Sequence, residues 1–336
     1  IYHKKFDDWT VDRMLSYIKE GTDDRLYAIA ELIRRGVELA LIYNSTKIDM
    51  FFLEKFKNIV EFEKVVAANP RDIETLRDAK RMGFSDKFIG QLWGMSQKEM
   101  FLLRREHNIF PVYKMIDTCA SEFSSYVPYF YSTYEQENES IVSEREKIVV
   151  LGSGPIRIGQ GVEFDYSTVH AIWSIRAAGY EAIIINNNPE TVSTDYTTSD
   201  KLYFEPLTLE DVLAIHEKEK PVGVIAQFGG QTPLNLSAEL EKYGVKILGT
   251  SPAVIDMAED RDLFRAMMDK LQIPMPEAGM AVDVDEALAI AERIGYPVMV
   301  RPSYVLGGRG MEVVYDPENL KIYMEAAEGV TPDRPI

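Results

Sequence analysis

A glycine-rich stretch contains the first residues of this chain that could bind an anion. It holds four glycines followed by two acidic residues: Gly152, Gly154, Gly159, Gly161, Glu163 and Asp165. An apolar run at 148–151 precedes it, and a helical pattern at 167–178 follows it. A loop of this kind lets backbone N–H groups approach an anion or a small polar ligand at the start of a helix.

The spacing of these glycines excludes two common nucleotide-binding motifs. The dinucleotide fingerprint Gly-x-Gly-x-x-Gly needs a third glycine where this chain has Arg157. The acidic residue expected about twenty positions later is also absent, because the next apolar run leads into Asn186, Asn187 and Asn188. The sequence contains no Gly-x4-Gly-Lys-Ser/Thr, so it has no P-loop.

A second glycine-rich stretch, 302–310, lies between expected strands at 297–301 and 311–314. Strand, glycine loop and strand form a flap that can close over phosphates, whose charge nearby arginines would meet. From these residues alone, a plain tight turn is an equal alternative. The chain has four histidines and no evident triad, so we assign no catalytic residue and no metal ligand.

Alternating strands and helices must position the first of these loops. Strands are expected at 148–151, 181–185, 202–204, 222–226 and 245–248, with helices between them. This alternation predicts a doubly wound parallel sheet, in which ligands bind at the carboxyl ends of the strands. The loops 152–165, 186–195 and 227–232 all follow strands, so we expect them to meet at that edge.

The first 142 residues differ in composition from the rest of the chain. They hold 5 of the 21 glycines and 3 of the 16 prolines. Helices are expected there at 11–20, 25–36, 49–68, 72–81 and 97–106, the last opened by the capping box Ser96-x-x-Glu99. Eleven phenylalanines and nine tyrosines in this part fit either an aromatic interface with a partner or plain core packing. We therefore expect three domains, a helical one at 1–142, an α/β one at 143–250 and a third at 251–336.

Charge and composition exclude several classes of function. The net charge of the 336 residues is −17, which disfavours a nucleic-acid partner. A single cysteine, Cys119, rules out an internal disulfide and fits a reducing compartment. No apolar run reaches the roughly 18 residues of a membrane span, and the start has no signal-peptide plan. We expect a soluble, cytoplasmic protein.

Several segments, in this order, resemble the large subunit of carbamoyl-phosphate synthetase. They are GSGPIRIGQGVEFDYSTVHA, NNNPETVSTDYTTSDKLYFEPL, FGGQTPLNLS, AEDRDLF and VRPSYVLGGRG, with a weaker resemblance in GFSDKFIGQLWG and PVYKMIDTCASEF. In that family a helical oligomerisation domain separates two homologous ATP-grasp halves. The resemblance implies that 1–142 is this oligomerisation domain, 143–250 a Rossmann-like pre-ATP-grasp domain, and 251–336 the first, truncated part of the second ATP-grasp domain.

The resemblance also implies an activity and the residues that serve it. The family's second half phosphorylates carbamate with ATP and Mg or Mn, giving carbamoyl phosphate for pyrimidine and arginine synthesis. Arg261 and Arg301 match positions that bind the ATP phosphates, and Gly307 and Gly308 match the loop that closes over them. Glu163 and Glu190 match positions that line the family's internal carbamate passage. From sequence alone, an equal alternative is that both glutamates brace loops at strand ends.

Partners and completeness follow from the same resemblance. It implies ATP and carbamate as substrates, a glutaminase small subunit or domain, and a further copy bound through the helical domain. Metal ligands are expected beyond the last residue, so we expect the chain to be inactive by itself. Two alternatives stay open. One is another ATP-grasp ligase, such as a biotin carboxylase or a glycinamide-type ligase; the other is a non-catalytic oligomerisation and tunnel module.

Overall fold

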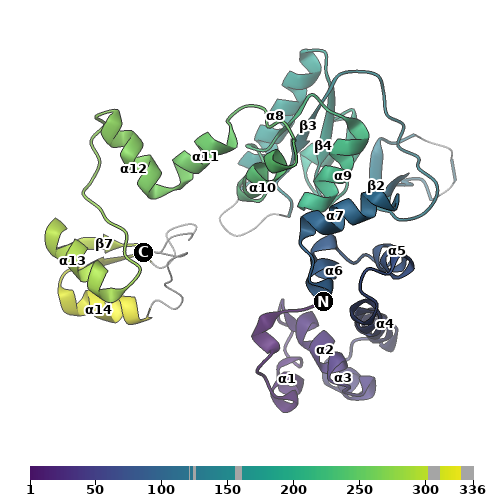
Figure 1. Cartoon of the computed structure of the whole chain (residues 1–336), viewed down its shortest axis with the longest axis horizontal. Helices are drawn as coiled ribbons and strands as arrows, with labels where there is room; N and C mark the ends of the chain where they lie inside the picture. The colour runs from purple at the N-terminus through teal and green to yellow at the C-terminus, as the bar shows by residue number, and fades with distance from the viewer. Residues whose placement is uncertain (121, 124–125, 156–160, 302–310, 327–336) are drawn as a thin grey trace. The chain divides into compact units, whose positions relative to one another are not determined.

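The computed structural model describes residues 1–120, 122–123, 126–155, 161–301 and 311–326 (Figure 1). The chain forms two compact units, one of Ile1–Lys147 with Ser199–Pro221 and the other of Ile148–Thr198 with Val222–Ile336. Within the described ranges, no helix is long and apolar enough to cross a membrane. The same ranges contain no group of three or more His, Cys, Asp or Glu side chains that could hold a metal ion.

The first unit begins with seven α-helices. They are α1 (Val11–Tyr17), α2 (Arg25–Arg34), α3 (Leu39–Thr46), α4 (Met50–Ala68), α5 (Ile73–Arg81), α6 (Asp86–Trp93) and α7 (Gln97–Glu106), after a short 3-10 turn, η1 (Lys4–Phe6). The sequence predicted five of them and missed α3 and α6. Both missed helices have eight residues and end at a residue in the left-handed conformation, Lys47 and Gly94.

Side-chain caps set the starts of several of these helices. Asp72 accepts from the backbone N–H of Thr75 at 2.8 Å, and the predicted capping box between Ser96 and Glu99 is present. Two apolar cores hold the helices together. Met14, Ile29, Leu32 and Leu53 are fully buried in one core, and Val66, Leu76, Ile89 and Met100 in the other.

A six-stranded sheet follows, with strand order β1-β2-β5-β4-β3-β6. Its strands are β1 (Val112–Met115), β2 (Tyr129–Thr133), β3 (Lys147–Leu151), β4 (Glu181–Ile185), β5 (Lys201–Tyr203) and β6 (Gly223–Ile225). β2 pairs in parallel with β5 and β3 in parallel with β6, so the expected parallel α/β sheet is confirmed. β1 pairs antiparallel with β2, and neither strand was predicted. Of the expected strand 245–248, Ile247 forms an isolated bridge to Val224.

The remaining helices belong to the two units separately. The first unit contains α9 (Leu209–Glu219). The second contains α8 (Glu163–Ala177), the 3-10 turn η2 (Val192–Thr194), α10 (Gln231–Lys242), α11 (Pro252–Glu259), α12 (Arg261–Lys270), α13 (Val284–Ile294) and α14 (Pro317–Ala326). An antiparallel hairpin of β7 (Val298–Val300) and β8 (Glu312–Val314) packs with α13 and α14 around a small core that includes Val300, Val314 and Leu320. The sequence missed α11 and α14.

Candidate functional site

The glycine-rich loop after β3 meets the loops after β4 and β6 so closely that side chains do not fit between them. A Cβ on Gly152 would lie 2.5 Å from the Asn186 side chain, and a Cβ on Gly229 would lie 2.2 Å from the Gly152 carbonyl oxygen. Real Cβ atoms do not approach other atoms this closely. Two of these glycines are therefore required by packing, and the expected meeting of the three loops is confirmed.

Asn186 connects the loop after β3 to the segment after β4. Its side chain is fully buried, its Oδ1 accepts from the backbone N–H of Gly154 at 2.9 Å, and its Nδ2 donates to Ser193 Oγ at 3.3 Å. Gly154 has a φ of 68°, a conformation that favours glycine. A neutral amide can donate and accept at once. Asn186 therefore fixes the direction of a backbone N–H at the start of the glycine loop.

A second connection runs from the first turn of α8 to η2. Asp165 accepts from the backbone N–H groups of Val192 and Ser193, each at 3.1 Å. Charged acceptors strengthen such hydrogen bonds, and a carboxylate in the first turn also favours the helix dipole. Asp165 thereby holds α8 and the 186–195 segment in a fixed arrangement.

The two predicted passage residues lie on the segments that Asp165 joins. Glu163 is the first residue of α8 and its side chain is exposed, with the carboxylate folded back against Gly161, where a Cβ would lie 2.1 Å from Oε2. Glu190 is also exposed, and its backbone N–H donates to Asn188 Oδ1 at 3.1 Å. Among the described residues, neither carboxylate has a side-chain hydrogen bond or ion pair that would mark it as a loop brace.

An aromatic row lies on α8 beside these loops. His170 is exposed, and its ring lies between Tyr166, at 4.2 Å between centroids, and Trp173, at 4.9 Å. Together with Ile225 and Phe228, part of this row lines a largely apolar hollow of about 490 Å³. His170 thus makes ring contacts with both neighbouring aromatic side chains on the surface of α8.

The structure describes two of the four residues predicted to bind ATP, Arg261 and Arg301. Arg261 is the first residue of α12, and the carboxylate of the preceding Asp260 accepts from Leu263 N at 2.9 Å. Arg301 follows β7 directly and is exposed. Gly307 and Gly308 lie outside the described residues.

Three families of known domains match the chain in succession. Residues 1–108 match the carbamoyl-phosphate synthetase large chain oligomerisation domain, residues 144–257 the carbamoyl phosphate synthase preATP-grasp domain, and residues 260–333 the carbamoyl-phosphate synthase L chain ATP binding domain. This chain belongs to the carbamoyl-phosphate synthetase large-chain family. The resemblance read from the sequence is confirmed, and the glycine loop, Asn186 and Asp165 all fall within the preATP-grasp match of this large chain.

Solved structures similar to this synthetase large chain include biotin carboxylases. The biotin carboxylase domain of Hydrogenobacter thermophilus 2-oxoglutarate carboxylase, solved with MgADP, ADP and bicarbonate, is 22% identical with a TM-score of 0.42 over 55% of this chain and 41% of that chain. Campylobacter jejuni biotin carboxylase is 17% identical with a TM-score of 0.41 over 55% and 42%. Thermus thermophilus N5-carboxyaminoimidazole ribonucleotide synthetase is 17% identical with a TM-score of 0.39 over 55% and 44%. The chain therefore spans about two fifths of the length of these relatives.

Sequence reasoning missed the roles of two residues in this large chain. Asn186 was noted only because the segment that begins with it lacks the acidic residue that would bind a ribose. Asp165 was noted only because it follows the glycine loop. The signal that could have identified them is the coincidence of three loops at one sheet edge, because backbone N–H groups exposed there need acceptors. Neither hydrogen bond follows from local spacing, since 32 residues separate Asn186 from Gly154 and 28 separate Asp165 from Ser193.

Proposed function

We propose that this chain takes part in the ATP-dependent phosphorylation of carbamate to carbamoyl phosphate, which feeds pyrimidine and arginine synthesis. The observation that carries the proposal is the succession of three large-chain domain matches, with the glycine loop bound to its neighbours inside one of them. Membership of the family supports an ATP-dependent ATP-grasp ligase. The identity of carbamate as the acceptor is the finer step of the proposal.

Glu163 and Glu190 are proposed to line the path along which carbamate travels. Their exposed side chains lie on two segments that Asp165 binds together, so both can face the same space. Carbamate decomposes in water, and a closed path would limit that loss. Two carboxylates without structural partners among the described residues fit a lining role better than a bracing role.

Arg261, Arg301, Gly307 and Gly308 are proposed to hold the ATP phosphates. Phosphoryl transfer depends on positioning and on neutralising charge more than on a nucleophilic side chain, which suits a site without a catalytic triad. Arg301 fits this role because it is an exposed cation next to the β7–β8 hairpin. Mg or Mn would add further positive charge. No group of three or more acidic or histidine side chains in the described ranges fits such a metal, and no step here depends on it.

The proposal extends to partners and location. Self-association is assigned to the helical part, whose match is to an oligomerisation domain. Phe51 and Phe52 support this assignment, because their side chains are 57% and 56% exposed and stack edge to face on α4. We further propose that a glutaminase subunit or domain supplies the ammonia and that the protein is cytoplasmic. We also propose that its three domains are divided near residues 142 and 250. The chain is proposed to be inactive by itself.

ATP formation from ADP and carbamoyl phosphate tests this function. We expect activity from a chain extended by about 200 residues, a domain's length, and none from the present chain. In the extended chain, Arg301→Ala should raise the KM for ADP by about tenfold, because a charge-assisted hydrogen bond to phosphate is lost. Lys321→Ala, on exposed α14 surface, is the matched control.

Each outcome of this assay separates the alternatives. Activity of the present chain would disprove its inactivity while supporting carbamate chemistry. An extended chain that makes ATP from ADP, inorganic phosphate and carboxybiotin, with release of biotin and bicarbonate, but not from ADP and carbamoyl phosphate, would replace the proposal with a biotin-carboxylase-like ligase. Absence of both activities, with self-association intact in sedimentation, would favour the non-catalytic oligomerisation module.

A further inference from the structure

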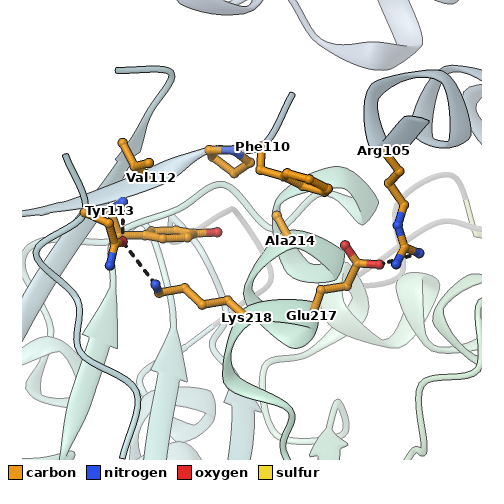
Figure 2. A pocket seen from close by; sticks show the side chains of 9 residues that line it. Arg105, Phe110, Val112, Tyr113, Ala214, Glu217 and Lys218 are labelled. Carbon is orange, nitrogen blue, oxygen red and sulfur yellow. Dashed lines mark hydrogen bonds and ion pairs between the residues drawn. The ribbon is translucent and has the colours of Figure 1, made fainter. Parts of the chain in front are cut away.

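A pocket in the first unit uses none of the residues assigned to ATP or carbamate. It has a volume of about 480 Å³, within the range of small-molecule sites. Its lining comes from the end of α7, the segment that leads into β1, the 134–140 segment and α9: Arg105, Phe110, Pro111, Val112, Tyr113, Asn138, Ala214, Glu217 and Lys218 (Figure 2). Apolar walls and a few polar groups at the ends are the usual composition of a ligand site.

The walls of this pocket are fixed before any ligand arrives. Asn138 Oδ1 accepts from Tyr113 N at 3.1 Å and from Lys218 Nζ at 3.0 Å, while Asn138 Nδ2 donates to the carbonyl of Ser140 at 2.8 Å. The Asn138 carbonyl oxygen therefore accepts two hydrogen bonds, and its amide nitrogen donates one. Tyr113 is 1% exposed and packs edge to face on Tyr203 at 4.9 Å. A site with fixed walls loses little entropy when it binds.

Two cations stand at the pocket's ends, and they differ in what neutralises them. Arg105 Nη1 pairs with Glu217 Oε1 at 2.7 Å. Lys218 donates to a neutral amide oxygen, and its Nζ lies 5.5 Å from the centroid of the Tyr113 ring. Figure 2 shows both side chains beside the same space, with the Phe110 ring across from Ala214.

The carboxylate next to Lys218 in sequence does not neutralise it. Glu219 is engaged with Lys147 at 3.2 Å and with Lys201 at 2.8 Å. Burial lowers the pKa of Lys218, and the charge of Glu219 offsets this effect only in part. A half-buried ammonium without a carboxylate partner among the described residues favours an anion from outside the chain.

We propose that this pocket binds a small aromatic or heterocyclic anion, with its phosphate or carboxylate at Lys218 and its ring against Phe110. Phe110 supplies a 44% exposed aromatic surface in a chain whose net charge is −17, so this pocket is a locally cationic exception. A flat apolar body with one anionic group satisfies both the walls and the unmatched cation. The proposal does not depend on the ligase activity.

Isothermal titration calorimetry of the full chain with phenyl phosphate and with benzoate tests the site, and benzyl alcohol is the neutral control. We expect one site per chain for at least one anion and no measurable binding of benzyl alcohol. The anion with the lower Kd distinguishes a phosphate ligand from a carboxylate ligand. Lys218→Met should weaken binding about tenfold or more, because a charge-assisted hydrogen bond is lost. Phe110→Ala should also weaken binding, and Lys220→Met, two residues away and exposed, should leave it unchanged.

A chemical measurement on the unmodified chain guards against a variant that fails to fold. Acetic anhydride modifies uncharged lysine amines, and mass spectrometry locates the modified residues. Phenyl phosphate or benzoate should protect Lys218 and leave Lys220 reactive. Equal affinity in Lys218→Met, no heat with either anion, or no protection of Lys218 would each overturn the proposed site.

Discussion

The two ends of α9 are each bound through a buried carboxylate, but with different partners. Glu210, in the first turn, binds residues of the helical part. Glu219, the last residue, binds residues at the strands β3 and β5 and is 1% exposed. A carboxylate in the first turn is favoured by the helix dipole, and one in the last turn is not. Glu219 therefore depends more strongly on its cations.

At the first end, two carboxylates share two cations. Lys80 contacts Glu210 and also Asp86, at 3.3 Å, and Arg104 contacts Asp86 at 2.7 Å and Glu210 at 3.6 Å. Glu210 Oε2 also accepts from the backbone N–H of Asp86 at 2.7 Å. Burial and repulsion from Glu210 raise the pKa of Asp86. At this end, Asp86 is therefore a second carboxylate that contacts the same two cations as Glu210.

At the second end, one carboxylate serves two lysines and a phenol. Glu219 accepts from Lys201 at 2.8 Å, from Lys147 at 3.2 Å and from the hydroxyl of Tyr203. Burial raises the pKa of Glu219, but the hydrogen bonds from Lys201 and Tyr203 outweigh it and lower that pKa overall. Lys201 is 4% exposed and has Glu219 as its one carboxylate partner within the described part of the chain. Among the described residues, no second carboxylate at this end pairs with Lys201.

Neutralising each carboxylate should therefore have unequal effects. Glu219→Gln leaves the buried ammonium of Lys201 without a carboxylate, and we expect it to lower the free energy of unfolding by about 3–5 kcal/mol. Glu210→Gln leaves Asp86 to bind Lys80 and Arg104 and relieves its repulsion, so we expect a loss of about 1–2 kcal/mol. Urea unfolding of both variants at pH 7 measures the difference.

The matched control for this pair is Glu239→Gln, an exposed position on α10. Surface changes of this kind alter stability by less than about 0.5 kcal/mol. If Glu210→Gln destabilises the chain as much as Glu219→Gln, then Asp86 does not act as a reserve carboxylate and the contrast between the two ends disappears.

Glu205, which precedes α9, and Glu219, its last residue, should respond to pH in opposite directions. Glu205, just before α9, is 4% exposed, and burial followed by repulsion from Asp211 raises its pKa from 4.5 to about 7. An acid with a raised pKa in the folded state contributes stability below its unfolded pKa and loses it as the pH rises through the folded pKa. Glu219, with a lowered pKa, contributes stability that is lost instead as the pH falls.

Glu205→Gln should remove the loss of stability between about pH 4.5 and pH 7. Relative to the unmodified chain, we expect the variant to gain about 2–3 kcal/mol when the pH is raised from 4.5 to 8. An amide oxygen can still accept from Ser132, whose hydroxyl donates to Glu205 at 2.9 Å. Unfolding by urea at several pH values measures this, and parallel pH profiles for the two chains would show that folding does not raise the pKa of Glu205.

The sequence predicted the parts of this fold that depend on local pattern. β4 and α7 lie at the expected residues, and α7 begins with the predicted capping box between Ser96 and Glu99. β1 and β2 were missed because β2 is completed by a distant partner, with Tyr129 opposite Leu202. β1 is an edge strand and β2 lies between β1 and β5, and short strands of this kind depend on their partners more than on a pattern of their own.

The candidate site shows the same limit. The glycines and the meeting of three loops followed from strand order, because parallel strands end at one edge. The roles of Asn186 and Glu210 did not follow from strand order. Asn186 binds Gly154, 32 residues away, and Glu210 binds Lys80, 130 residues away. Helix α8 begins at Glu163, four residues before the predicted start, because Asp165 binds η2 and the first turn gains partners that local pattern does not show.

The smallest expected effect comes from the neighbour of Arg104. Arg105 forms a second ion pair between α7 and α9, with Glu217 at 2.7 Å, but its side chain is 50% exposed. Solvent screens such pairs, so Glu217→Gln should lower the free energy of unfolding by less than about 0.5 kcal/mol. Urea unfolding at low and at high salt measures this, with Glu210→Gln as the buried comparison. A loss as large as that of Glu210→Gln would mean that exposed pairing, and not burial, holds α7 on α9.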